Sequence, residues 1–279
     1  MGIPSYADRM AGVSGSAVRE ILKLTQQPDI ISFGGGLPSA DSFPMESLKE
    51  ILHDLTDNLS QELLQYGQTE GYDPLRQEIV KLMATKGVNV AMEEVLITSG
   101  SQQGLDLIAK SFINPGDKIV VESPTYLAAL QTFRMYGAEF IEAPVDADGV
   151  MADELDKILA SEENVKLIYM IPSFQNPSGR TVSAERRKAI MEVVQKYDVI
   201  LIEDAPYEDL KYTDDVYPCM KSMDTTGQVL YFGSFSKVIT PGFRLGYSIA
   251  SEPILSRMII GKQSCDLNCS VFSQAVLAE

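Results

Sequence analysis

The sequence predicts an α/β protein of three layers, α/β/α, built on a mostly parallel sheet of seven strands. The first observation is that short apolar strands alternate with amphipathic helices from residue 95 onward. Strands that are apolar along their whole length are typical of a parallel sheet that helices cover on both faces. The second observation is size, because 279 residues with a 45% hydrophobic content are enough for one large core.

The chain before residue 95 is expected to be mainly helical. Ser16 is a plausible N-cap for a first helix, because the apolar residues that follow it have helical spacing. An apolar run then ends in the three glycines 34–36, which either turn the chain or let its backbone approach a ligand closely. Further helices are expected from Pro44 to the region before 58–60, and over 73–86.

The remaining elements alternate along the chain. Strands are expected at 95–98, 118–122, 139–142, 166–171, 199–203, 229–232 and 245–250, and helices at 102–113, 126–136, 153–160 and 184–197. Residues 273–279 have the pattern of a helix interior, so the sequence is expected to break off within a helix. We expect residues 1–50 to form an arm with a helical segment, and residues 51–279 to form one large domain that is incomplete at its end.

Composition and charge exclude several classes of partner. The net charge is −16 and the isoelectric point is near 4.5, whereas phosphate backbones are bound by clustered Lys and Arg. The sequence has no run of 18 or more apolar residues, its start lacks the pattern of a signal peptide, and three cysteines do not form a disulfide framework. A cytoplasmic protein without a nucleic-acid or membrane partner is therefore expected.

No metal site is predicted. His53 is the single histidine and is expected on the exposed side of a helix. Cys265 and Cys269 are four residues apart on an expected helix, and two thiols without a nearby histidine do not make a zinc site. Both cysteines are therefore expected to have a packing role.

Polar and aromatic residues follow several predicted strands, at the edge where ligands bind in such sheets. Ser101 and Gln102 begin a helix, whose free N–H groups and dipole can bind an anion. Tyr126 could stack on a flat heterocycle, and Asn176 could donate to a phenolic oxygen. Asp204 would suit a protonated pyridine nitrogen, because a buried carboxylate needs a partner. Each residue alone also fits a plainer role: a capped helix start, core packing, a turn or a cap.

The segment Ser234-Phe235-Ser236-Lys237, followed by Arg244, has the composition of a phosphate site beside a reactive amine. Two hydroxyls and a guanidinium suit a phosphate dianion. An unprotonated lysine can form a Schiff base with an aldehyde. Taken alone, the segment equally fits a surface loop with an ordinary lysine. Its combination with the residues at the other strand ends favours a binding site.

Taken together, these motifs give the chain a resemblance to a known family. It resembles the fold-type-I, pyridoxal-phosphate-dependent aminotransferases of class I/II over nearly its whole length. The matching motifs are Ile31-Ser32-Phe33-Gly34-Gly35-Gly36-Leu37-Pro38, Tyr66-Gly67-x-x-x-Gly71, Ser99-Gly100-Ser101-Gln102-Gln103, Pro172-x-x-x-Asn176-Pro177-x-Gly179, Asp204-x-x-Tyr207 and Ser234-x-Ser236-Lys237-x-x-x-Pro241-Gly242-x-Arg244-x-Gly246. The opening Ser16-x-x-Arg19-Glu20-Ile21-Leu22 is similar to the branch of 2-aminoadipate and multi-substrate aminotransferases.

The resemblance implies a role for each residue that contacts the reacting part of pyridoxal 5′-phosphate. Lys237 would bind the cofactor aldehyde and later carry the substrate proton. Asp204 would keep the pyridine nitrogen protonated, which makes the ring an electron sink. Tyr207 and Asn176 would bind the phenolic oxygen, and Tyr126 would stack on the ring. Lys237, Asp204 and Tyr207 are thus the catalytic candidates.

The resemblance also implies which residues bind the cofactor phosphate and the substrate. The phosphate would be held by Ser101, Gln102, Ser234, Ser236 and Arg244. Tyr66 would reach the phosphate on a neighbouring subunit, which implies a homodimer. Substrate would be bound by Gly35, Gly36 and Asn176. Arg19 would contact an acidic substrate side chain, unless it is an ordinary solvated arginine of its helix.

The chain departs from the family pattern at its end. Members of the family continue into a small C-terminal domain with an arginine that binds the substrate α-carboxylate, and no residue here matches it. The resemblance therefore predicts either a chain that binds cofactor but turns over poorly, or a portion of a longer protein.

Three functions stay open at this stage. The first is a ping-pong aminotransferase for acidic, aromatic or branched amino acids and their 2-oxo acids. The second is another reaction of the same fold, such as a lyase or a decarboxylase. The third is a regulatory module that binds the cofactor without catalysis, against which the acidic charge counts.

Overall fold

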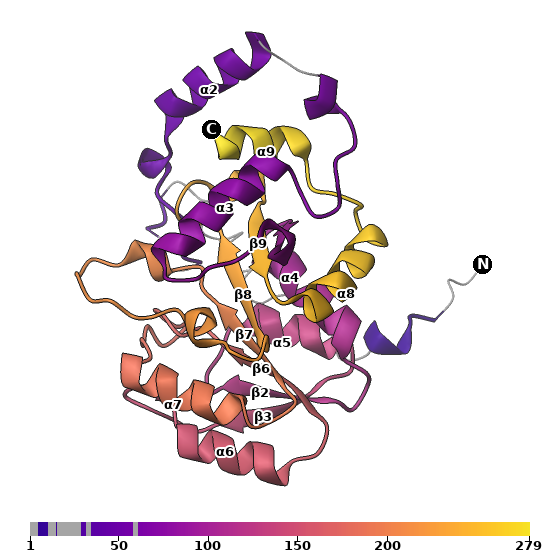
Figure 1. Cartoon of the computed structure of the whole chain (residues 1–279), viewed down its shortest axis with the longest axis vertical. Helices are drawn as coiled ribbons and strands as arrows, with labels where there is room; N and C mark the ends of the chain where they lie inside the picture. Colours follow the sequence, from indigo (N-terminus) through magenta and orange to yellow (C-terminus); the bar gives the residue numbers. More distant parts are fainter. Residues whose placement is uncertain (1–4, 11–14, 16–28, 32–34, 58–60) are drawn as a thin grey trace.

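A seven-stranded sheet lies between layers of helices in the computed structural model, which describes residues 5–10, 15, 29–31, 35–57 and 61–279 (Figure 1). The strands lie in the order β1-β9-β8-β7-β6-β2-β3. Their bounds are Val95–Thr98 (β1), Lys118–Glu122 (β2), Glu139–Ala143 (β3), Val165–Met170 (β6), Ile200–Asp204 (β7), Val229–Ser234 (β8) and Gly246–Ile249 (β9). The prediction of an α/β/α fold on a seven-stranded sheet is confirmed.

One strand of the sheet runs against the others. β9 is antiparallel to both β1 and β8, whereas the other neighbouring pairs are parallel. The sheet is therefore mostly parallel, as the apolar strands predicted. Because β9 runs in the opposite direction, it begins at the edge where the other strands end. Arg244, two residues before β9, lies at that edge for this reason.

The expected helices are present with bounds that differ by a few residues. The helices are Met45–Asp57 (α2), Asp73–Thr85 (α3), Ser101–Phe112 (α4), Leu127–Arg134 (α5), Ala152–Ser161 (α6), Ala184–Val194 (α7), Glu252–Gln263 (α8) and Val271–Ala278 (α9). Helix α8 and the small hairpin β4 (Val145–Asp146) and β5 (Gly149–Val150) were not predicted. The helix expected after Ser16 lies outside the described residues.

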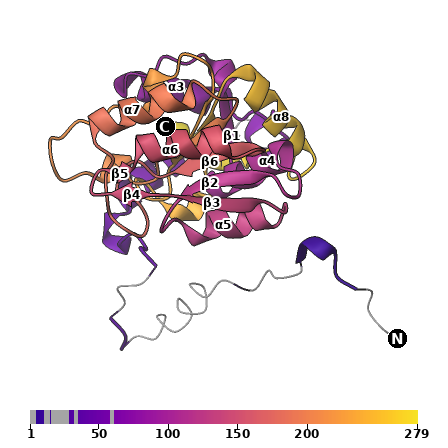
Figure 2. The ribbon, with the colours of Figure 1, turned by 90° about the horizontal axis from the view of Figure 1, so that it is seen from below.

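Alternating side chains of the strands build a core on each face of the sheet. Leu230 and Phe232 of β8 pack with residues of α4, α5 and α8 on one face. Val229 of the same strand packs against α6 and α7 on the other face. Tyr231 packs with residues of α3 there. Figure 2 shows α5 and α6 on opposite sides of the strands. Burial of apolar side chains on both faces is what the continuous apolar strands require.

The register of the central strands brings distant residues together. Asp204, the last residue of β7, is paired with Phe232 of β8. Strand β8 continues to Ser234, and Lys237 follows in the turn after it. Residues 33 positions apart in the sequence are thus neighbours at the carboxyl edge of the sheet. Ligands bind at this edge in parallel α/β sheets.

Helices α2, α3 and α9 gather at one end of the molecule (Figure 1). The expected boundary between residues 1–50 and 51–279 falls within α2, and the division into an arm and a large domain stays a prediction. His53 lies on α2 with an exposed side chain, as expected. In the part of the chain that the structure describes, no helix combines the length and the apolar character that crossing a membrane requires.

The cysteines do not lie on a helix, and that prediction is wrong. Helix α8 ends at Gln263, so Cys265 lies in the turn that follows and Cys269 in the loop before α9. Cys265 is exposed and Cys269 is buried. No group of three or more potential metal ligands occurs among the described residues.

Candidate active site

The strand ends bring most of the predicted site residues to one edge of the sheet. Asp204 ends β7, Asn176 lies in the loop after β6, and Lys237 lies in the turn after β8. Ser101 is the first residue of α4, which follows β1, and Tyr126 is the N-cap of α5, which follows β2. The local sequence explains this, because each apolar strand is followed by a short turn of Ser, Pro, Gly or Asn.

Asp204 is a buried carboxylic acid with one oxygen bound and one unbound. Its Oδ2 accepts a hydrogen bond of 2.7 Å from the Tyr169 hydroxyl. Its Oδ1 is buried and has no hydrogen-bond partner among the described residues. Burial raises the pKa of Asp204 to about 6, although the bond from Tyr169 acts in the opposite direction. A buried carboxylate oxygen without a partner is costly, and a protonated nitrogen of a ligand would satisfy it.

Tyr207 and Asn176 form a pair beside Asp204. The Asn176 amide donates to the Tyr207 hydroxyl over 3.3 Å. Burial raises the pKa of Tyr207, so its hydroxyl keeps its proton at neutral pH. One amide and one hydroxyl that converge in this way can both donate to a single ligand oxygen.

Lys237 is a half-buried amine with a neighbour from the far end of the sequence. Its Nζ donates to the carbonyl oxygen of Gly36 over 3.0 Å. Gly35 and Gly36 adopt φ values of +85° and +54°, which side chains of L-residues rarely permit. Burial and the nearby guanidinium of Arg244 lower the pKa of Lys237. A larger fraction of its amine is therefore unprotonated and nucleophilic than for a solvated lysine.

Arg244 and the start of α4 form a cradle for an anion. Arg244 itself has a left-handed backbone, with φ of +53°, and its Nη1 lies 3.5 Å from Ser236 Oγ. Gly100, the N-cap of α4, leaves room for the guanidinium, because a Cβ there would lie 2.9 Å from Arg244 Nη2. The Ser234 hydroxyl accepts from the backbone N–H of Ser236 over 3.2 Å. A guanidinium, hydroxyls and a helix N-terminus together suit a phosphate.

The side chains of three predicted site residues, Gln102, Tyr126 and Tyr66, lie outside the contacts described so far. The Gln102 side chain donates to Thr132 Oγ1 over 2.6 Å, which leaves its backbone in the first turn of α4 as the part that faces the cradle. Tyr126 packs against the core on the α5 side of the sheet. Tyr66 is 81% exposed, so that it is available to another molecule. Arg19 lies outside the described residues.

Tyr169, Glu122 and Gln175 were not among the predicted site residues. Tyr169 stands within an apolar strand, where an aromatic residue is ordinary. Glu122 is buried at the end of β2, and burial raises its pKa to about 7 although the N–H of Ile171 donates to it over 2.9 Å. An acid at the end of an apolar strand is the signal that had singled out Asp204, and it applied equally to Glu122.

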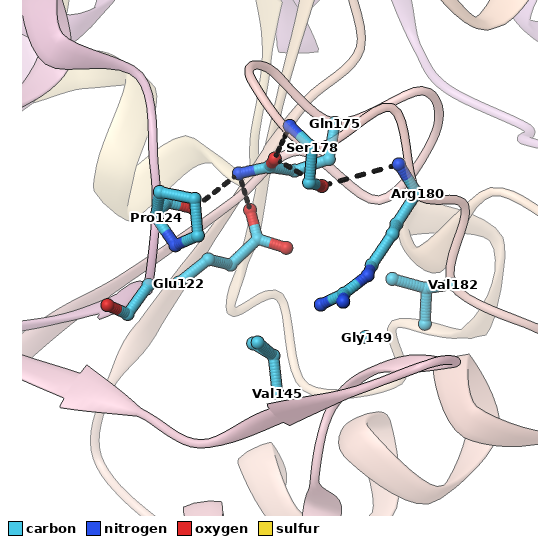
Figure 3. Close-up of a pocket in the computed structure, with 9 residues that line it drawn as sticks. Glu122, Pro124, Val145, Gly149, Gln175, Ser178, Arg180 and Val182 are labelled. Atoms are coloured by element: carbon cyan, nitrogen blue, oxygen red, sulfur yellow. Dashed lines mark hydrogen bonds between the residues drawn. The ribbon is translucent and has the colours of Figure 1, made fainter.

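Gln175 connects the two loops that carry Tyr126 and Asn176. Its amide nitrogen donates to the carbonyl oxygen of Pro124 over 2.8 Å and lies 3.5 Å from Glu122 Oε2, as Figure 3 shows. Its amide oxygen accepts from both the backbone and the hydroxyl of Ser178. These residues line a small cavity of about 10 Å³, which is close to the space of one water molecule. The cavity is too small for a cofactor.

The residues at the edge fit pyridoxal phosphate as a group. An unbound buried carboxylate oxygen, a half-buried amine and an anion cradle are the three features that its pyridine nitrogen, aldehyde and phosphate require. The fit rests on the donor set of this chain and on the space that Gly100 leaves for Arg244.

Comparison with known proteins agrees with this assignment. Residues 28–279 match the family model described as "Aminotransferase class I and II". The chain is 42% identical to aromatic-amino-acid aminotransferase 1 of Thermococcus litoralis over 97% of its own length and 66% of that protein. It is 36% identical to 2-aminoadipate transaminase of Thermus thermophilus, over 96% of its own length and 66% of that protein.

The fold is also similar to that of a solved aminotransferase structure. The crystal structure of Pyrococcus horikoshii kynurenine aminotransferase in complex with PMP is 41% identical, with a TM-score of 0.92. The match covers 98% of this chain and 69% of that one. The chain thus spans about two thirds of the length of the proteins that it matches.

Proposed function

Because the chain belongs to the class I and II aminotransferase family, we propose that it acts as a pyridoxal-phosphate-dependent aminotransferase. The reaction moves an amino group between an amino acid and a 2-oxo acid in ping-pong order. The observation that carries the proposal is the convergence of Lys237, whose pKa is lowered, and Asp204, whose Oδ1 lacks a partner, at one edge of the sheet. A nucleophilic amine and a carboxylate for a ring nitrogen are the two groups that this cofactor needs from a protein.

The residues of this chain would hold the cofactor at three points. Asp204 Oδ1 would accept from the protonated ring nitrogen, which would also satisfy its buried oxygen. Asn176 and Tyr207 would donate to the phenolic oxygen, and Tyr126 would stack on the ring. The phosphate would be bound by Ser101, Gln102, Ser234, Ser236 and Arg244. The side chain of Gln102 is bound to Thr132, so its backbone N–H is the group that we assign to the phosphate.

The chemistry divides between the cofactor and Lys237. When bound, pyridoxal phosphate supplies an aldehyde that condenses with amines and a ring that accepts the electrons freed at the substrate α-carbon. Lys237 would bind that aldehyde at rest. Once a substrate amine has displaced it, its free amine would remove the proton from the α-carbon and deliver it to the carbon that had been the cofactor aldehyde. Positioned acid–base catalysis of this kind contributes about 10²–10⁴-fold to a rate.

Lys237 is suited to proton transfer by its surroundings. Its pKa is lowered by burial and by the positive charge of Arg244, which makes the free amine available nearer to neutral pH. The Gly36 carbonyl holds its ammonium form by a hydrogen bond of 3.0 Å. Among the described residues, no acidic side chain pairs with Lys237 to keep it charged.

The substrate and the second subunit complete the proposal. Gly35, Gly36 and Asn176 would contact the substrate, and Arg19 would contact an acidic side chain. The names of the relatives include aromatic and 2-aminoadipate enzymes, which supports acidic and aromatic amino acids as donors. Exposed Tyr66 would reach the phosphate of a partner subunit in a homodimer in the cytoplasm. An acidic net charge of −16 supports a small-molecule substrate rather than a nucleic acid.

A single-turnover experiment with the 279-residue chain tests the proposal. The purified protein is mixed with pyridoxal phosphate, and its visible absorption spectrum is recorded before and after addition of glutamate or 2-aminoadipate. We expect a band of lysine-bound cofactor that the amino acid converts to the pyridoxamine form, with one equivalent of 2-oxo acid released. Measurement of one turnover detects the reaction even if repeated turnover is slow.

Lys237→Ala should abolish both the band and its conversion. Lys81→Ala is the matched control, because Lys81 is an exposed helix residue paired with Glu78. A band that persists in Lys237→Ala, or a band that forms without any 2-oxo acid release, would contradict the proposed function. Release of carbon dioxide or of a fragment of the amino acid would instead indicate decarboxylase or lyase chemistry.

A further inference from the structure

Tyr169 is a fully buried tyrosine whose hydroxyl contacts the proposed site from inside the sheet. It lies on β6, paired with Ile202 of β7, two residues before Asp204. Because side chains two residues apart on a strand share a face, Tyr169 and Asp204 point to the same side of the sheet. The hydroxyl of Tyr169 donates to Asp204 Oδ2 over 2.7 Å. This bond leaves Oδ1 as the oxygen that no described residue binds.

The ring of Tyr169 is held where it lies. It is 0% exposed and belongs to the core beneath α4 and α5. The ring of Phe133 on α5 meets it edge-on, with centroids 5.9 Å apart and planes at 73°. Such edge contacts and close packing hold an aromatic ring in one orientation. The hydroxyl therefore cannot move away from Asp204 without disturbing the core.

The hydroxyl keeps the role of donor at every relevant pH. Burial raises the pKa of Tyr169 well above its ordinary value, and the negative charges of Asp204 and Glu122 act in the same direction. The other titratable groups that face this pair are Tyr126 and Tyr207. A phenol that keeps its proton stabilises the ionised form of the carboxylic acid beside it.

We propose that Tyr169 is a positioning residue, which fixes the carboxylate of Asp204 so that Oδ1 faces the ring nitrogen of the cofactor. The inference rests on the proposed function, because it concerns the same carboxylate. A freely rotating carboxylate would present either oxygen at a range of angles, whereas the bond at Oδ2 selects one orientation. Preorganised charge of this kind lowers the barrier because no reorientation is needed during the reaction.

The matched test is a pair of tyrosine variants. Tyr169→Phe removes one oxygen and keeps the ring. Tyr136→Phe is the control, because the Tyr136 hydroxyl donates to Asp106 over the same 2.7 Å but lies away from the strand ends. Each variant is loaded with pyridoxal phosphate, and two quantities are measured: the half-reaction rate with glutamate, and the pH titration of the visible band.

We expect Tyr169→Phe to form the band, to slow the half-reaction about tenfold, and to shift the midpoint of the titration. The tenfold effect corresponds to the loss of one hydrogen bond to a charged group. Tyr136→Phe should leave both quantities unchanged. A purely structural role of Tyr169 would lower the temperature of unfolding but would not move the titration.

The outcomes separate this inference from the proposed function. If the wild-type chain forms no band, or forms a band without releasing 2-oxo acid, the proposed function fails. If the wild type reacts and Tyr169→Phe matches it in rate and in titration, only the role of Tyr169 is overturned. If Tyr169→Phe does not fold, 3-fluorotyrosine at position 169 keeps the hydroxyl and makes it a stronger donor. A shifted titration midpoint would then support the role, and an unchanged midpoint would overturn it.

Discussion

Asp204 and Glu122 are two buried acids, each at the end of a strand of the same sheet. They differ in the hydrogen bonds that the protein makes to their carboxyl groups. Asp204 ends β7 and faces the α4 and α5 side, where Tyr169 donates to one oxygen. Glu122 ends β2, and its Oε2 accepts from the backbone N–H of Ile171 and lies near the Gln175 amide. Burial raises the pKa of both acids, to about 6 for Asp204 and about 7 for Glu122.

The difference indicates what each acid does. Both donors to Glu122, the Ile171 N–H and the Gln175 amide, come from the segment that follows β6, so that the acid ties the end of β2 to that loop. Asp204 Oδ1 has no hydrogen-bond partner among the described residues, although leaving a buried acceptor unbound costs about 1–3 kcal/mol. A protein that maintains such a cost at a strand end, beside an amine and an anion cradle, is arranged for a ligand. The position of an acid alone does not reveal this, whereas its hydrogen bonds do.

The largest effect should be on the rate of the half-reaction. Asp204→Asn removes the charge that faces the ring nitrogen, and we expect the rate of conversion of bound cofactor by glutamate to fall about 10²–10³-fold. Glu122→Gln keeps the same shape and should change this rate by no more than a few fold. Stopped-flow absorbance of the bound cofactor measures both. Equal losses in the two variants would contradict the distinction between a catalytic and a structural acid.

The second effect is on the pH dependence of stability of the cofactor-free protein. The folded pKa of each acid lies above its unfolded value, so the folded state binds more protons and the free energy of unfolding falls as pH rises. The fall should lie between about pH 4 and 6 for Asp204 and between about pH 4.5 and 7 for Glu122. Each acid should contribute on the order of 1–3 kcal/mol to this fall in the free energy of unfolding.

Urea unfolding of the wild type and of the two variants at a series of pH values measures these contributions. Asp204→Asn and Glu122→Gln should each make the profile flatter in its own window. Added pyridoxal phosphate should remove the Asp204 contribution, because the ring nitrogen then binds the ionised form, and should leave the Glu122 contribution in place. A Glu122 contribution that also disappears on loading would show that the two acids act as one unit.

The sequence was sufficient for the fold and for the ends of the strands, and the reason is physical. Apolar strands and amphipathic helices are local patterns, so β1 to β3 and β6 to β9 and most helices could be predicted from them. Lys237 and Asp204 could be predicted as site residues because strand ends are predictable and because their motifs resemble a family. Helix α8 was missed because its apolar residues lie on more than one side, so that no clear stripe distinguishes it.

The contacts that join distant segments could not be predicted. The bond between Lys237 and the Gly36 carbonyl spans 201 residues, and nothing in either segment indicates the other. The role of Tyr169 depends on the register between β6 and β7, which the sequence of a buried apolar strand does not specify. Gln102 was assigned to the phosphate by its motif, yet its side chain is bound to Thr132 on α5, a contact that exists only after packing.

The smallest effect should come from Ser178, which holds the Gln175 amide in the orientation that serves Glu122. The Ser178 hydroxyl donates to Gln175 Oε1 over 2.6 Å, and this fixes the amide nitrogen toward Glu122 and the Pro124 carbonyl. Ser178→Ala removes one neutral hydrogen bond while the backbone N–H of Ser178 keeps its own bond to Gln175. We therefore expect the free energy of unfolding to fall by only about 0.5–1.5 kcal/mol.

The same variant should raise the pKa of Glu122, because its amide donor is less well held, and should leave the half-reaction rate unchanged. Urea unfolding at pH 5 and pH 8 measures the first effect, and stopped-flow absorbance measures the second. Ser161→Ala is the control, since the Ser161 hydroxyl lies on an exposed helix end at 3.4 Å from the Ile158 carbonyl. A loss of rate in Ser178→Ala would mean that the loop around Glu122 also positions the reacting groups, and the two acids would then differ less than their hydrogen bonds indicate.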